Sequence, residues 1–113
     1  AELTQQLEEF DMTLNEYQAQ AYKTAMYQEK LYPIASLMVE SAELADLFVK
    51  PWLRGDDKAI ERHKIISEAG DVLWNLACML KDQDISLTDV AEYNLTKLAD
   101  RAARNVIKGD GDR

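Results

Sequence analysis

The signals that start and stop helices constrain the fold of this chain more than any other feature. Its 113 residues include only four glycines and two prolines, which disfavours a fold rich in strands and turns. Thr13 and Glu16 form a capping-box pattern, which predicts a first helix running to about residue 30. Pro33 suits the first turn of a second helix, because its missing N–H would have no partner there.

The remaining signals predict two further helices. The second helix should end near Lys50, because Pro51 disfavours helical geometry at the residue before it. A third helix is predicted over about 58–82, and Ser86 caps a fourth that runs to about residue 107. The pattern predicts one all-α domain over 1–113, with a core at 14–108 and a flexible tail at 109–113.

Composition excludes several classes of function. The formal net charge of −8 argues against a nucleic-acid partner, because proteins that bind nucleic acid usually have a basic surface. The single cysteine, Cys78, can form no disulfide within the chain and indicates a reducing compartment. No apolar stretch is long enough to cross a membrane, and the acidic first residues are unlike a secretory signal. We therefore expect a cytoplasmic protein without a membrane partner.

Four carboxylates stand beside the apolar stripes of the second and third helices. Glu40 falls in the middle of one stripe and Glu43 at its margin, while Glu68 and Asp71 are neighbours on one face of the next helix. Acids beside a core are costly unless something satisfies them. Two antiparallel helices would therefore each offer a carboxylate pair to one interior site.

Four close carboxylates repel one another unless their pKa values rise or cations lie between them. Mg²⁺ prefers oxygen ligands and substrate phosphates, so we expect Mg²⁺, with Mn²⁺ as a substitute. His63 and Cys78 lie elsewhere, which disfavours softer metals. Either motif alone is also typical of a solvated helix face, but the two together favour a metal site.

Other residues are candidates for binding a phosphorylated substrate. A polar and basic stripe on the fourth helix could clamp phosphates, although cations near a helix C-terminus also favour the helix dipole. Trp52 could stack on a nucleobase or anchor a loop, and Gln18 could line the base pocket or pack in the core. The stripe consists of Asn94, Lys97, Arg101, Arg104 and Lys108.

These pieces together resemble the MazG-like all-α nucleoside triphosphate pyrophosphohydrolases over about residues 14–112. The matching segments are Asn15–Gln18, Glu40–Leu44, Glu68–Trp74, Asn94–Leu98 and the Gly-Asp-Gly-Asp tail. The resemblance implies a four-helix bundle that assembles as a homodimer or homotetramer. It implies cleavage of a (deoxy)nucleoside triphosphate between the α and β phosphates.

The resemblance also implies roles for single residues. Mg²⁺ would be bound by Glu40, Glu43, Glu68 and Asp71, which carry the catalysis, and Asn75 would contact metal or substrate. The residues that bind the base vary across the family, so the preferred base does not follow from it.

Three alternatives can be compared with this hypothesis. A phosphoribosyl-ATP pyrophosphohydrolase-like enzyme shares the fold type and differs in substrate. A di-iron carboxylate bundle needs Glu-x-x-His on two helices, and no glutamate here is followed three positions later by histidine. A non-catalytic helical interaction module would not need four acids beside apolar stripes.

Overall fold

The computed structural model describes residues 11–104, and these residues form four α-helices without a strand. The helices are α2 (Leu14–Lys23), α3 (Leu31–Leu53), α4 (Arg62–Asp82) and α5 (Leu87–Ala103). The prediction of an all-α chain with four helices is confirmed for this part of the chain. No described helix is both long and apolar enough to span a bilayer.

The predicted caps are present, and they fix where α2 and α5 begin. Thr13 accepts the N–H of Glu16 at 3.1 Å, and Glu16 accepts the N–H of Thr13 at 3.0 Å, which completes the capping box. Ser86 accepts the N–H of Asp89 at 3.0 Å at the start of α5. Both caps join residues three positions apart, which is why the sequence alone predicts them.

Three predicted helix boundaries were wrong. Helix α2 ends at Lys23 instead of residue 30, since the Thr24 hydroxyl and N–H both donate to the Ala21 carbonyl. Helix α3 continues through Pro51 to Leu53, because proline in a last turn removes only one helical hydrogen bond. Helix α4 begins at Arg62 instead of residue 58, after a turn in which Asp56 accepts the N–H of Lys58.

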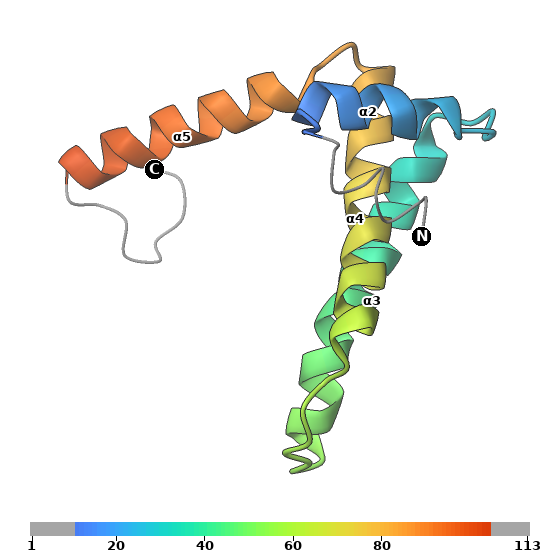
Figure 1. Ribbon diagram of the computed structural model, residues 1–113, viewed down its shortest axis with the longest axis vertical. Helices are drawn as coiled ribbons and strands as arrows, with labels where there is room; N and C mark the ends of the chain where they lie inside the picture. The colour runs from blue at the N-terminus through green and yellow to red at the C-terminus, as the bar shows by residue number, and fades with distance from the viewer. Residues whose placement is uncertain (1–10, 105–113) are drawn as a thin grey trace.

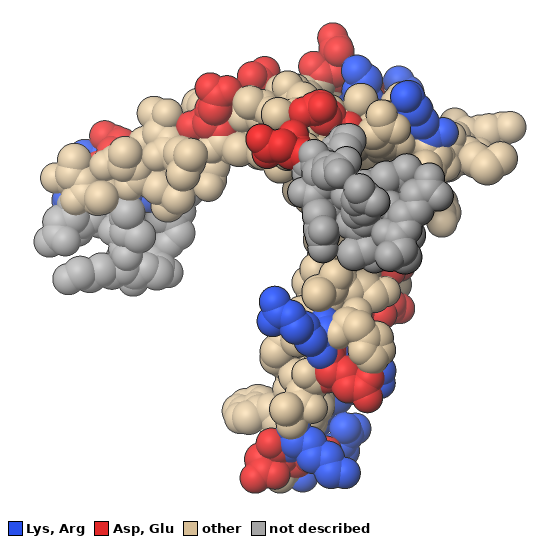
Figure 2. Space-filling view, viewed as in Figure 1, with Lys and Arg blue, Asp and Glu red and all other residues tan. Residues whose placement is uncertain are grey.

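Helices α3 and α4 form a long antiparallel hairpin, and α2 crosses α4 near one end of it (Figure 1). Helix α5 packs on α2 and then runs away from the hairpin (Figure 1). The small core lies where α2, α4 and the start of α5 meet, around Ala21, Ala77 and Leu87. Lysine and arginine gather with acids toward the other end of the hairpin (Figure 2).

Residues 11–104 of one chain do not by themselves close a helical bundle. The radius of gyration is 17.2 Å, against about 13 Å for a compact domain of about 100 residues. Large apolar side chains remain exposed on α3 and α4, among them Met38 at 75% and Ile66 at 61%. Further exposed ones on these helices are Val39, Phe48, Val49 and Leu73.

Candidate metal and nucleotide site

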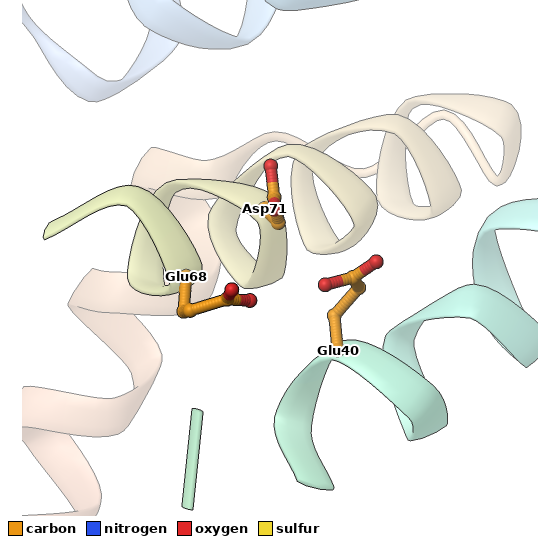
Figure 3. A group of neighbouring side chains, drawn as sticks. All are labelled: Glu40, Glu68 and Asp71. Carbon is orange, nitrogen blue, oxygen red and sulfur yellow. The ribbon is translucent and has the colours of Figure 1, made fainter. Parts of the chain in front are cut away.

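The packing of α3 against α4 brings acids from both helices together. Glu40 lies near the middle of α3, and Glu68 and Asp71 lie one turn apart on α4. These three residues each offer one carboxylate oxygen, and the three oxygens lie within 4.8 Å of one another. Glu40 and Glu68 direct their carboxylates toward each other across the hairpin (Figure 3). The structure thus joins three of the four predicted acids in one cluster.

Glu43, the fourth predicted acid, lies on an exposed turn of α3 beside the cluster. The pKa of Glu40 is raised, mainly because burial penalises its charge and then because Glu43, Asp71 and Glu68 repel it. Among these charges Glu43 has the largest effect. The four acids therefore form one electrostatic unit, although Glu43 is outside the closest group.

Several oxygen atoms in this cluster are buried without a hydrogen-bond donor. Among the described residues, Glu40 Oε2, Glu68 Oε2 and Asn75 Oδ1 have no partner. The Asn75 side-chain N–H donates to the Asp71 carbonyl oxygen at 2.8 Å, so only its oxygen remains for a ligand. Buried oxygens of this kind are costly unless a donor or cation satisfies them.

The donor set fits a hard divalent cation. Carboxylate and amide oxygens are the ligands that Mg²⁺ and Mn²⁺ prefer. Cys78 is buried, and burial raises the pKa of its thiol. His63 is on the surface, with Nε2 at 3.3 Å from Glu61 Oε2. Neither residue belongs to the cluster.

Two adjoining hollows lie beside the carboxylates. The smaller, of about 210 Å³, is lined by Ser36, Glu40, Asp71 and Asn75 together with Tyr32 and Trp74. Tyr32 and Trp74 also line the larger hollow, of about 670 Å³, which is bounded by residues 24–29 except Ala25. The shared aromatic walls make the two hollows neighbours, so one elongated ligand could occupy both.

Three aromatic rings shape the larger hollow. The Tyr27 ring stacks on that of Tyr32 at 5.8 Å between centroids and meets Trp74 edge-on at 6.2 Å. The Trp74 indole N–H donates to the Thr24 hydroxyl at 2.8 Å. We call Tyr27, Tyr32 and Trp74 the aromatic trio.

Asp82 fixes one member of this trio. The hydroxyl of Tyr27 donates to Asp82 Oδ2 at 2.7 Å, and that of Tyr22 donates to Oδ1 at 2.6 Å. Burial raises the pKa of Tyr27, and the hydrogen bond to Asp82 raises it further. The Tyr27 hydroxyl therefore stays protonated and keeps its ring in place.

Sequence reasoning missed the aromatic trio. It placed Tyr27 in the first helix, and it assigned the Trp74 ring no role in substrate binding. The high density of tyrosines between residues 17 and 32 was the available signal. That density did not show which of the tyrosine rings would line the hollow and which would pack in the core.

Gln18, a predicted base-pocket residue, lies in the protein interior. Its side-chain N–H donates to the carbonyls of Ala77 and Ile85, both at 3.0 Å. Its side-chain oxygen accepts the N–H of Leu87 at 3.0 Å. Gln18 as a whole is only 4% exposed. Its role in the structure is therefore to join α2 to α4 and α5.

Of the other predicted substrate residues, Asn75 lies beside the carboxylates, whereas Trp52 and the stripe on α5 do not. Trp52 is 74% exposed at the end of α3 farthest from the aromatic trio. Asn94 and Lys97 line a separate hollow of about 350 Å³ on α5, and Lys97 Nζ lies 5.8 Å from the Tyr93 ring centroid. Arg101 lies farther along α5, which projects from the hairpin (Figure 1). Lys108 and the tail are outside the described residues.

Comparison with known proteins identifies the family of this chain. The model of the MazG nucleotide pyrophosphohydrolase domain matches residues 28–105. The chain belongs to this family. The matched range contains the predicted site residues Glu40, Glu43, Glu68, Asp71, Asn75, Trp52, Asn94, Lys97 and Arg101.

A phage protein is similar over nearly the whole chain. The Gene 37 protein of Mycobacterium phage L5 is 34% identical over 113 residues, covering 89% of this chain and 98% of the phage protein. No solved structure matches the chain significantly. The MazG family name indicates a pyrophosphohydrolase acting on nucleotides.

Proposed function

We propose that this MazG protein hydrolyses (deoxy)nucleoside triphosphates to the monophosphate and diphosphate. The carboxylate cluster with its unpartnered buried oxygens supports this proposal best. It lies beside a hollow with an aromatic wall, which suits a ligand that is a polyanion at one end and a flat ring at the other. A non-catalytic helical module would gain nothing from these unpartnered carboxylate oxygens.

The metal would be held by Glu40, Glu43, Glu68 and Asp71, and Asn75 lines the same hollow as Glu40 and Asp71. When bound, Mg²⁺ or Mn²⁺ would polarise phosphate oxygens and lower the pKa of an attacking water. The fit rests on the three oxygens that lack partners and on a donor set made only of oxygen.

The nucleotide would place its base against the aromatic trio and its α-phosphate at the carboxylates. Aromatic stacking tolerates any base, which suits a pocket with three rings in its wall. Tyr32 and Trp74 border both hollows, so they would contact the nucleotide where base and sugar meet the phosphates. This arrangement leaves Gln18 and Trp52 outside the base pocket.

The reaction would begin with water attacking the α-phosphorus. A bond forms between the water oxygen and that phosphorus, and the bridging bond to the β-phosphate breaks. A carboxylate from α3, the helix that carries Glu40 and Glu43, would take the proton. The diphosphate leaves with the bridging oxygen.

Asn94, Lys97 and Arg101 would act on the substrate from a second copy of the chain. Helix α5 leaves its own hairpin (Figure 1), and the exposed apolar residues of α3 and α4 need a cover. A homodimer or homotetramer would supply that cover, close the four-helix bundle and bring a basic stripe to an acidic site. The net charge of −8 makes nucleic acid an unsuitable partner. A nucleotide substrate would place the reaction in the cytoplasm.

The decisive test is diphosphate release from canonical and damaged nucleoside triphosphates, with phosphoribosyl-ATP in the same panel. Glu40→Gln and Glu68→Gln should abolish turnover, while Glu92→Gln on exposed α5 is the matched control. Hydrolysis in oxygen-18 water should label only the monophosphate. Label found only in the diphosphate would contradict attack at the α-phosphorus, and full activity of either mutant would contradict the site.

A further inference from the structure

The segment Asn15–Gln18 of α2 has no part in the proposed reaction, although it is one of the segments that resemble the family. Asn15 is exposed and Gln18 is buried. They are neighbours on one side of the helix, because residues three positions apart lie next to each other on its surface. Both side chains bond to the start of α5, at residues 73 and 69 positions away. The segment is therefore a contact between α2 and α5.

Two of the first three N–H groups of α5 bond to α2. The Leu87 N–H donates to Gln18 Oε1 at 3.0 Å. The Thr88 N–H donates to Asn15 Oδ1 at 3.2 Å. The third N–H bonds to the cap residue Ser86. The first N–H groups of a helix have no acceptor within it, so α2 supplies acceptors that water supplies at an isolated helix end.

The chain enters α5 through an elbow, residues 83–86, whose conformation is also held. The Ile85 N–H donates to the Leu80 carbonyl at 2.9 Å, and the Asp84 N–H donates one turn back in the same way. Asp84 has a φ of 61°, in the left-handed region that aspartate tolerates better than most residues. The Gln18 side-chain N–H donates to the Ile85 carbonyl at 3.0 Å. One amide group thus holds the chain just before α5 and at its first residue.

Beyond its first turn, α5 has little support from its own chain. Among the described helices it packs mainly on α2, and it then projects from the hairpin (Figure 1). Tyr93 and Leu95, in the middle of α5, are 69% and 66% exposed. The direction of α5 therefore depends on how its first turn is held.

Small changes at this first turn are magnified along the helix. Lys97 and Arg101 follow Leu87 by about 15 and 21 Å along the axis, at about 1.5 Å per residue. A rotation of about 10° at the first turn would move the Arg101 backbone by about 4 Å. Such a displacement separates a cation from a phosphate oxygen, because charge-assisted hydrogen bonds need a distance of about 2.7–2.9 Å.

We propose that Asn15 and Gln18 are positioning residues, which set the direction of α5 and thereby the placement of Lys97 and Arg101. The action of these two cations on a substrate rests on the proposed function. Gln18 also bonds to α4 and stabilises the core, so its replacement changes more than the direction of α5. Asn15 makes its one side-chain hydrogen bond to α5 from an exposed position. Its replacement therefore tests the proposal with the core intact.

The first measurement is the distance between α4 and the far part of α5, by pulsed electron paramagnetic resonance. Arg62→Cys and Ala99→Cys place spin labels at exposed positions, and an excess of unlabelled chains leaves one labelled chain in each assembly. Asn15→Ala should broaden the distance distribution or shift it by about 4 Å, as the rotation above predicts. Asn15→Asp keeps an oxygen acceptor and should retain the wild-type distribution. Gln20→Ala, exposed on the same helix, is the matched control and should change nothing.

The second measurement is nucleotide hydrolysis in magnesium. Asn15→Ala should lower kcat about tenfold or more, because misplacing a catalytic group by about 1 Å already costs activity. Asn15→Asp should restore kcat. Magnesium binding without nucleotide, measured by calorimetry, should be the same in all these variants, because the carboxylates lie on α3 and α4. Far-UV circular dichroism checks that each variant is folded.

The two measurements separate this proposal from the proposed function. An unchanged distance distribution in Asn15→Ala would mean that α5 takes its direction from elsewhere, and the proposal would be wrong. A changed distribution with normal kcat would also overturn it, because the direction of α5 would then not matter to the reaction. If the wild-type chain hydrolyses no nucleotide, the proposed function fails, and the distance distributions alone decide whether Asn15 directs α5.

Discussion

Replacement of Gln18 by leucine distinguishes a structural role from substrate binding. Leucine has a similar size but can neither donate to the Ala77 and Ile85 carbonyls nor accept the Leu87 N–H. Each of these hydrogen bonds contributes about 1 kcal/mol net. The three together predict a loss of about 3 kcal/mol in the free energy of unfolding.

Two features of the site increase the expected loss. The Leu87 N–H belongs to the first turn of α5 and has no acceptor within the helix. Leu87 is only 5% exposed, so water does not easily replace Gln18. A loss of about 3 kcal/mol is a large part of the roughly 5–15 kcal/mol that stabilises a typical domain.

The assay is urea unfolding followed by far-UV circular dichroism at fixed protein concentration, because assembly would make stability depend on concentration. Gln20→Leu, on an exposed position of the same helix, is the control and should change stability by less than about 0.5 kcal/mol. Nucleotide KM is measured on folded Gln18→Leu protein. A stability within about 0.5 kcal/mol of wild type, together with a raised KM, would refute the structural role and return Gln18 to the base pocket.

Three further predictions concern the site. In EDTA, the raised pKa of Glu40 means that the folded chain retains a proton that the unfolded chain releases, so stability should fall as pH rises from about 4.5 through the folded pKa. Thermal melts across this pH range should show that Glu40→Gln reduces this slope, and an unchanged slope would contradict the assignment. Trp74→Ala should raise nucleotide KM about 10- to 100-fold through lost stacking, whereas Trp52→Ala should leave KM unchanged, and equal effects would contradict the placement of the base. If α5 acts across a subunit interface, mixing inactive Lys97→Ala with inactive Glu68→Gln should restore part of the activity, and no recovery from verified mixed oligomers would place the stripe outside the site.

The sequence alone predicted the features that depend on neighbours along the chain. The caps at Thr13 and Ser86 join residues three positions apart, so the sequence alone shows their pattern. The pairing of Glu68 with Asp71 follows from 3.6 residues per turn, and the position of Glu40 in an apolar stripe indicated that it would face another helix. Local geometry and periodicity therefore sufficed to predict the carboxylate cluster.

Only the tertiary structure decided which other residues would join the site. Gln18 forms its hydrogen bonds with residues 59 to 69 positions away, and no local pattern shows that such partners exist. Tyr27 reaches the hollow because α2 ends early at Thr24, and Asp82, 55 residues distant, holds its hydroxyl. Periodicity shows the face on which a residue lies. The direction of α5 and the choice of rings around the hollow depend on how distant helices pack.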